Sequence, residues 1–219
     1  MAIGIRAITD EQKAVRRQHI VDTAKILFKT SDFKYITMAE IAKQTNLAKG
    51  TLFLYFKTKE EVFLNLARQE IGKWNEKLVK IKKQIKETNR SVDAVRLADL
   101  LLESLDNEVL VRLLAILDDT LEQNIDFNRA YEFKTFLKHQ MIKSGNLIEE
   151  ILPDLKKGHG IKILQQSFIC LIGTYKICNP SQIVKEVIKK PGLELFNRNF
   201  HDTLREMLIC QIRGFAAAK

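Results

Sequence analysis

Apolar side chains recur every three or four residues along most of the chain, which is the spacing of one face of an α-helix. This pattern predicts long helices at about residues 10–30, 58–86, 92–105, 107–124, 127–151, 157–178 and 198–217. Proline and glycine interrupt the pattern, and one short helix fits between Pro180 and Pro191. No stretch shows sustained alternation of apolar and polar residues, so we expect an all-α protein.

The stretch from Thr37 to Val62 carries two signals of helix starts. Thr37 is followed three residues later by Glu40, and Thr58 is followed three residues later by Glu61. Each pair is a capping-box pattern. The threonine hydroxyl accepts from an amide of the first helical turn, and the glutamate accepts from the amide of the threonine itself. The pattern therefore predicts helices that begin next to Thr37 and Thr58.

A tight turn is predicted between these two starts, at Asn46. Ile41 and Ala42 begin a helical spacing that Asn46 interrupts and that Leu52 and Phe56 resume. Asparagine tolerates the left-handed backbone conformation better than most residues with a side chain. Ala42 is small enough to lie where two helices cross closely. Two helices joined by such a turn form a helix-turn-helix.

The second helix of this pair, at about residues 48–56, has short and basic side chains near its start. Lys49, Gly50 and Thr51 suit the major groove of DNA. Glycine in a first helical turn costs about 1 kcal/mol relative to alanine. A close approach of the backbone to a phosphate would explain why Gly50 occurs there.

Residues 36–63, ITMAEIAKQTNLAKGTLFLYFKTKEEVF, resemble the signature of TetR-type transcriptional repressors. The resemblance implies a helix-turn-helix DNA-binding domain at residues 1–57 and an all-helical effector-binding and dimerisation domain at residues 58–219. The family usually has tyrosine where this chain has Phe53, so the phosphate hydrogen bond of that hydroxyl is absent here. By their positions in the motif, which all but Phe53 match, the residues expected to contact DNA are Thr37, Lys49, Gly50, Thr51, Phe53, Tyr55 and Lys59.

The charge of the chain favours a polyanionic partner. Its 219 residues are 46% hydrophobic, enough for a buried core, and the formal net charge is +9. Residues 1–60 hold 11 Lys and Arg against 6 Asp and Glu, so positive charge is densest where the helix-turn-helix lies. Lys59 at the positive end of a helix is unfavourable unless a phosphate binds there. Arg6, ahead of the first helix, could reach a minor groove.

The apolar stripes on two helices near the end of the chain predict a homodimer. The helix at about 157–178 has two apolar stripes, and a helix with two such faces must bury both. The final helix, at about 198–217, has a comparable stripe, so two helices from each chain could form a four-helix interface. A symmetric dimer would read both halves of a palindromic operator on double-stranded DNA. The alternative is that both helices are central in a monomer. The stripes consist of Ile161, Leu164, Phe168, Leu171, Tyr175 and Cys178; of Ser167, Cys170, Thr174 and Ile177; and of Phe200, Leu204, Leu208, Gln211 and Phe215.

The resemblance also implies a small-molecule effector that releases the repressor from its operator. Five residues combine aromatic surface with a few polar groups, as small-molecule pockets do. These candidate effector contacts are Trp74, Phe133, Phe136, His139 and Gln140. The long helix that begins at Thr58 would carry the change from the effector to the DNA-binding domain.

Other functions have less support in the sequence. The four histidines are scattered, no metal-binding or glycine-rich phosphate motif occurs, and the three cysteines match no zinc pattern, so we expect no enzyme, cofactor or metal. The cysteines lie in apolar stripes and are expected in the core. We expect a cytoplasmic protein, because the first residues are too weakly apolar for a signal peptide. A DNA-binding architectural or interaction module without an effector, an all-α enzyme, and an activator stay open as alternatives.

Overall fold

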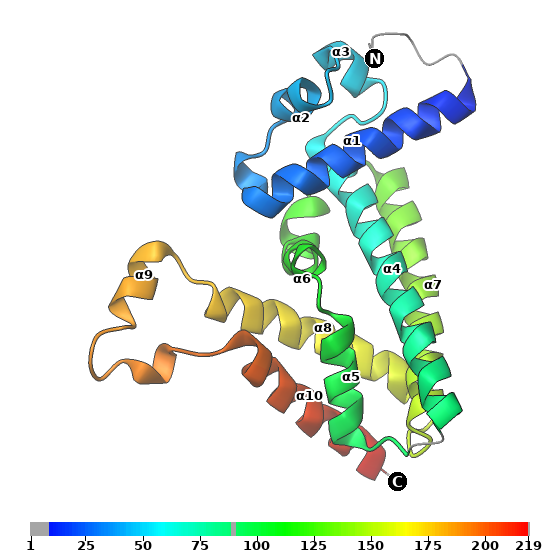
Figure 1. Cartoon of the computed structure of the whole chain (residues 1–219), viewed down its shortest axis with the longest axis vertical. Coiled ribbons are helices and arrows are strands. Elements are labelled where there is room, and N and C mark those ends of the chain that lie inside the picture. Colours follow the sequence, from blue (N-terminus) through cyan, green and yellow to red (C-terminus); the bar gives the residue numbers. More distant parts are fainter. Residues whose placement is uncertain (1–8, 89–90, 219) are drawn as a thin grey trace. The chain divides into compact units, whose positions relative to one another are not determined.

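The computed structural model describes residues 9–88 and 91–218, and these fall in two compact units (Figure 1). Of the described residues, the head unit comprises 9–70 and 116–136, and the body unit comprises 71–88, 91–115 and 137–218. All regular structure in the described residues is helical, which confirms the all-α prediction. None of the described helices is both long and apolar enough to cross a membrane. Arg6 lies outside the described residues, and the domain boundary after residue 57 stays a prediction.

The head unit begins with α1 (Asp10–Thr30), as the periodicity predicts. A complete capping box, which we did not predict from the sequence, starts this helix: Gln12 N donates to Thr9 Oγ1 at 3.2 Å, and Thr9 N donates to Gln12 Oε1 at 3.3 Å. The head unit continues with η1 (Phe33–Tyr35), α2 (Met38–Gln44), α3 (Lys49–Phe53), the start of α4 (Lys59–Thr88), the π-helical η2 (Leu117–Leu121) and the start of α7 (Phe127–Ile151).

An aromatic cluster forms the centre of the head unit. The ring of Phe63 in α4 lies edge-on to Phe28 of α1, with centroids 5.2 Å apart, and to Phe33 of η1, with centroids 5.0 Å apart. Ile20 and Ala24, one turn apart on α1, are fully buried as well. Edge-to-face ring pairs contribute about 0.5–1.5 kcal/mol beyond their buried area.

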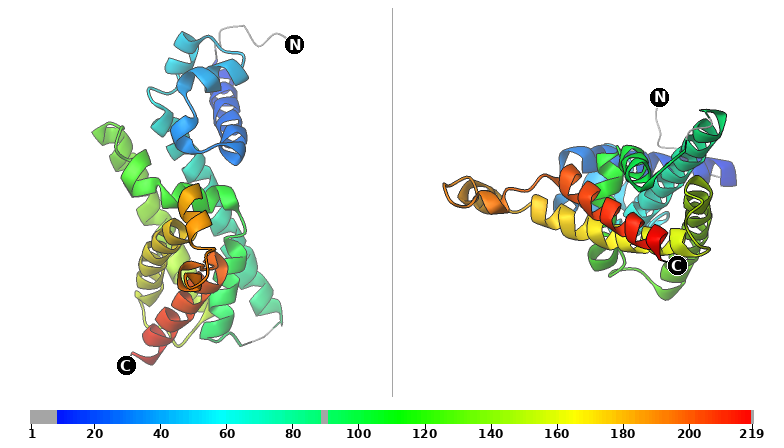
Figure 2. Two further views of the ribbon diagram at one scale, coloured as in Figure 1. Left: turned by 90° about the vertical axis from the view of Figure 1, so that its left-hand side faces the viewer. Right: turned by 90° about the horizontal axis from the view of Figure 1, so that it is seen from below.

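The body unit contains the rest of α4 and α7 together with α5 (Ala94–Ser104), α6 (Glu108–Ala115), α8 (His159–Cys178), α9 (Gln182–Val187), η3 (Glu194–Phe196) and α10 (Phe200–Ala217). Its core consists mainly of leucine and isoleucine side chains from α4, α5, α7, α8 and α10. The short helix predicted between Pro180 and Pro191 is confirmed as α9. The segment that carries α9 extends away from the pair formed by α8 and α10 (Figure 2).

The single helix predicted over residues 107–124 is wrong. The α-helix ends at Ala115, and a π-helical turn follows. There, Leu121 N donates to Ile116 O, five residues earlier, at 3.1 Å. Leu117 and Leu121 are both buried. The wider π-helical turn therefore keeps both leucine side chains in the core at the point where the α-helix ends.

Helices α8 and α10 pack against each other in antiparallel directions. His159 at the start of α8 contacts Phe215 near the end of α10, with ring centroids 5.1 Å apart, and Gln211 Nε2 donates to Ile163 O at 3.0 Å. The stripe predicted on the final helix therefore faces α8 of the same chain. Cys210 is exposed, which corrects the prediction that all three cysteines lie in the core.

Helices α7 and α8 approach each other closely at a pair of glycines. A Cβ atom added to Gly160 would lie 2.1 Å from Gly145 O, and one added to Gly145 would lie 2.7 Å from Cγ1 of Ile161. Only hydrogen side chains fit between these backbones. The glycines therefore fix how α8 packs on α7.

We expect Gly160→Ala to destabilise the protein by roughly 1–3 kcal/mol, because backbone atoms cannot yield to the added methyl group. Gly72→Ala is the matched control: Gly72 lies within α4, and a Cβ there meets nothing within 4 Å. The control should stabilise by up to about 1 kcal/mol through helix propensity. Urea denaturation of both variants checks this, and equal midpoints would refute the close contact.

Candidate nucleic-acid interface

The turn between α2 and α3 has the predicted conformation. Asn46 has φ of 54°, in the left-handed region. Leu47 N donates to Ala42 O at 2.9 Å, and the buried Thr45 hydroxyl donates to Ile41 O at 2.8 Å. Ala42 is 3% exposed, which fits a close crossing of the two helices. The turn is therefore fixed by its own backbone and one buried side chain.

The two predicted helix starts are formed, each with the threonine contact of a capping box, but neither glutamate is seen to accept from the amide of its threonine. Glu40 N donates to Thr37 Oγ1 at 3.1 Å, and Glu61 N donates to Thr58 Oγ1 at 3.2 Å. The Glu61 carboxylate accepts from Lys57 N at 2.9 Å, one residue before the amide that a capping box would use. The buried glutamate thus fixes the chain just ahead of α4.

Helix α3 is shorter than the predicted range 48–56 and directs its polar start outward. Leu52 is fully buried, whereas Lys49 and Gly50 are exposed and Thr51 is half-buried. A Cβ added to Gly50 would meet nothing within 4 Å, so no contact inside the chain requires glycine there. The ring of Phe53 is 41% exposed, and the Lys49 ammonium lies 5.9 Å from its centroid.

The ammonium of Lys59 binds backbone carbonyl groups of the head unit. Its Nζ donates to Phe33 O and to Ile36 O, both at 3.0 Å, and lies 4.2 Å above the Phe33 ring. These contacts give a reason within the chain for a lysine at this helix start. A phosphate contact of Lys59 stays a prediction.

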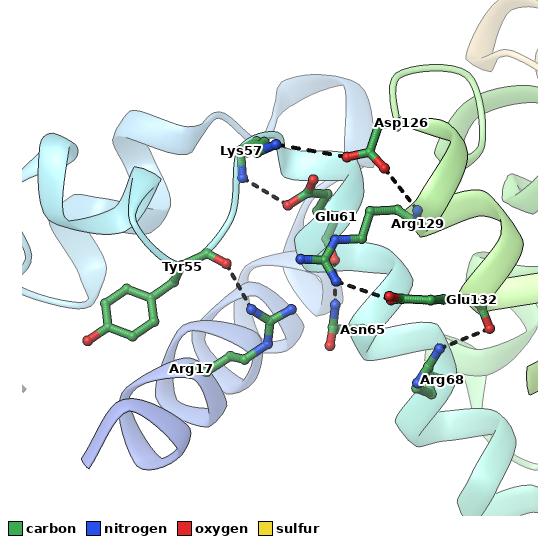
Figure 3. A network of polar contacts seen from close by, with 9 residues as sticks. All are labelled: Arg17, Tyr55, Lys57, Glu61, Asn65, Arg68, Asp126, Arg129 and Glu132. Carbon is green, nitrogen blue, oxygen red and sulfur yellow. Dashed lines mark hydrogen bonds and ion pairs between the residues drawn. The ribbon is translucent and has the colours of Figure 1, made fainter. Parts of the chain in front are cut away.

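Arg17 connects α1 to the end of the helix-turn-helix (Figure 3). Its guanidinium donates to Tyr55 O at 2.8 Å and lies 4.1 Å from the centre of the Phe56 ring. The contact could not be read from the sequence, because the partners are 38 residues apart.

All seven predicted DNA contacts lie in the head unit. Two apolar side chains that the sequence pattern did not single out are exposed close to the helix-turn-helix. Leu54 is 79% exposed next to α3, and Tyr35 is 64% exposed with the Lys34 ammonium 4.7 Å from its ring. The available signal was spacing: Leu54 lies two positions from both Leu52 and Phe56, so it points away from the buried face.

The five candidate effector contacts are divided between the units. In the body unit, Trp74 Nε1 donates to Ser104 Oγ at 2.7 Å, His139 is exposed and Gln140 is half-buried. In the head unit, Phe133 is buried beside Phe136, with ring centroids 6.1 Å apart. Their assignment to an effector stays a prediction. No group of three or more His, Cys, Asp or Glu side chains in the described part of the chain could hold a metal ion.

Two family models match the chain. The model described as bacterial regulatory proteins of the tetR family matches residues 20–66, and the model described as the tetracyclin repressor-like C-terminal domain matches residues 68–219. The HTH-type transcriptional regulator QacR of Staphylococcus aureus (strain Mu50) is 40% identical over 75 residues, which are 34% of this chain and 39% of QacR. The chain spans little more than a third of the length of the curated relatives it matches.

Solved structures share the fold over almost the whole chain. The multidrug binding protein EbrR, in complex with imidazole, has a TM-score of 0.57 at 14% identity, over 90% of this chain and 94% of EbrR. The repressor FadR of Thermus thermophilus, in complex with lauroyl-CoA, has a TM-score of 0.53 at 19% identity, over 93% of this chain and 96% of FadR. At these identities the likeness concerns the fold alone.

The contacts of Lys59 predict a structural role that does not depend on DNA. We expect Lys59→Met to destabilise the protein by about 1–3 kcal/mol, because two carbonyl groups lose a charged donor. The control Lys49→Met removes an exposed ammonium and should stay within about 0.5 kcal/mol of the parent. Chemical denaturation without DNA measures both, and equal stability of the two variants would contradict the role.

Proposed function

Because the chain belongs to the TetR family of transcriptional regulators, we propose that it is a sequence-specific DNA-binding regulator, most simply a cytoplasmic homodimeric repressor that a small-molecule effector releases from a palindromic operator. The observation that carries this proposal is the helix-turn-helix itself. Its turn is fixed at Asn46, and the next helix begins with exposed Lys49 and Gly50.

In this proposal α3 enters the major groove. Thr51 would reach base edges with its hydroxyl and methyl groups, and Lys49 would contact a phosphate. The open space around Gly50 supports a close approach of the backbone to DNA. Thr37, Phe53, Tyr55 and Lys59 complete the proposed contacts. Phe53 would supply apolar surface in place of a hydroxyl.

The proposed dimer would use the faces of α8 and α10 that the body unit leaves uncovered. Ile169 and Ile177 on α8 are 68% and 63% exposed, and Met207 on α10 is 45% exposed. Gly173 lies between the two isoleucines on the same face, and a Cβ there meets nothing within 4 Å. Such an apolar face with a small residue at its centre supports close packing of a second copy.

The proposed effector is a small molecule, and two structural neighbours support this. EbrR was solved in complex with imidazole and FadR in complex with lauroyl-CoA, so a shared fold accommodates ligands of very different chemistry. Trp74, Phe133, Phe136, His139 and Gln140 are proposed as the contacts of the effector. A change in the spacing of the two DNA-binding heads would alter the fraction of dimers able to fit adjacent major grooves.

Selection of the purified protein against random duplex DNA at near-physiological salt tests the proposed function. We expect enrichment of a palindrome that two chains, or a pair of dimers, bind together. The stoichiometry on the best sequence gives the number of chains. Binding without enrichment that merely fades as salt rises would refute sequence-specific regulation.

On the selected operator, we expect substitutions at Thr51 and Lys49 to have different effects, the first on base preference and the second on overall affinity. Thr51→Ala should change the base preference, at a cost of about 1–3 kcal/mol for the affected base pair, because it removes a base contact. Lys49→Ala should weaken binding to all sequences and lower the salt dependence by about one unit of slope, because it removes a phosphate contact. Affinity titrations at several salt concentrations distinguish them. If Thr51→Ala instead lowers the affinity equally for all sequences, Thr51 orients the protein on DNA and does not contact a base.

A further inference from the structure

The head unit contains a cavity of about 300 Å³ whose lining is rich in arginine. Three helices of this unit contribute to it: α1, the start of α4 and the start of α7 (Figure 3). This volume lies at the lower end of the range for small-molecule pockets. The lining residues are Arg17, Glu61, Leu64, Asn65, Arg68, Arg129, Glu132 and Phe133.

Two of the three guanidinium groups contact only uncharged acceptors. Arg17 donates to Tyr55 O at 2.8 Å, and Arg68 donates to Glu132 O at 3.3 Å, both backbone carbonyl oxygens. Neither guanidinium forms an ion pair with a carboxylate in residues 9–88 or 91–218. The ring of Phe136 lies 4.8 Å beneath the Arg68 guanidinium and supports it.

The two glutamates of the lining already have other partners. Glu61 accepts from Lys57 N at 2.9 Å, and the Glu132 carboxylate accepts from Arg129 at 3.1 Å. Burial, and after it the positive charge of Arg129, lower the pKa of the half-buried Arg17; the Glu61 carboxylate opposes this, Arg68 lowers the pKa further, and Glu132 raises it slightly. The arginines therefore repel one another across the cavity, and an anion among them would relieve that repulsion.

We propose that this cavity binds a small molecule that carries a carboxylate or a phosphate group. Arg17, Arg68 and Arg129 together would bind the oxygens of this group. A guanidinium presents parallel N–H donors that match the oxygens of either group. Leu64 and Phe133 would contact the apolar part of the ligand.

Anion binding would also affect the helix-turn-helix, because Arg17 contacts its end as well as the cavity. The same guanidinium that faces the cavity holds the carbonyl of Tyr55, two residues after α3 ends. An anion that draws Arg17 towards Arg68 and Arg129 competes with this bond and changes how the end of the helix-turn-helix is held. This step rests on the proposed DNA-binding function, whereas the binding of the anion does not.

Titration calorimetry and thermal melting of the full chain without DNA test the site. The probes are inorganic phosphate and succinate, each compared with sodium chloride at equal ionic strength so that general screening is the same. We expect at least one probe to bind and to raise the melting temperature, because a ligand that binds only the folded state stabilises it. The preferred probe identifies the anion as phosphate or carboxylate.

Arg68→Gln and Arg129→Gln should each weaken binding of that probe by about tenfold, because each removes a charged donor. Arg198→Gln is the matched control: it removes an exposed arginine of the body unit and should leave binding unchanged. The melting temperature without probe shows that each variant is folded. Equal binding by the parent and both pocket variants, or no binding of either probe, would overturn the proposal.

A DNA measurement separates the pocket from the proposed function. On a selected operator, the probe should lower the affinity of the parent more than that of Arg68→Gln. If both pocket variants weaken DNA binding while their response to the probe equals that of the parent, the arginines bind the DNA backbone and the pocket proposal is wrong. Probe binding that depends on Arg68 and Arg129, in a protein that selects no DNA sequence, would support the pocket and refute the regulator.

Discussion

The burial of Phe63 between Phe28 and Phe33 is the contact on which the head unit depends. Helices α2 and α3 have seven and five residues, and isolated helices shorter than about 12–15 residues are marginal in water. Their shape therefore comes from packing, through Ile41, Leu52 and their neighbours in the core. Because Phe63 belongs to α4, the first turns of that helix are part of the structure that presents α3.

Two cations complete this structure at opposite ends of the helix-turn-helix. Lys59 binds the carbonyl groups of Phe33 and Ile36 ahead of α2, and Arg17 binds the carbonyl group of Tyr55 after α3. A buried or half-buried carbonyl without a donor costs about 1–3 kcal/mol, so these contacts stabilise Ile36 and Tyr55, which lie outside the helices, while the carbonyl of Phe33 also accepts from Ile36 N. Basic residues near a DNA-binding surface thus stabilise the fold, in addition to making the surface positively charged. In the head unit the proposed anion would act on one of these two contacts.

The body unit uses its apolar surface in two ways. The buried faces of α8 and α10 pack against each other, while glycine at positions 145 and 160 lets α7 and α8 approach closely. The opposite face of α8 stays exposed at Ile169 and Ile177. The exposed face is not the predicted second stripe, because Thr174 of that stripe is buried, whereas Ile169 and Ile177 together form the surface that the proposed dimer would cover.

The sequence by itself determined the helices and the turn of the helix-turn-helix. Helical periodicity predicted α1 and α7 at their observed bounds, and Asn46 marked the left-handed turn, because both signals depend on residues close together in the chain. Periodicity did not reveal the break after Ala115, since the buried Leu117 and Leu121 of the π-helical turn are four residues apart, as they would be on one face of an α-helix. Only the tertiary structure brought Arg17 to Tyr55 and grouped three arginines around one cavity. Such contacts join residues far apart in sequence, and their geometry is set by how the helices pack, which no local pattern records.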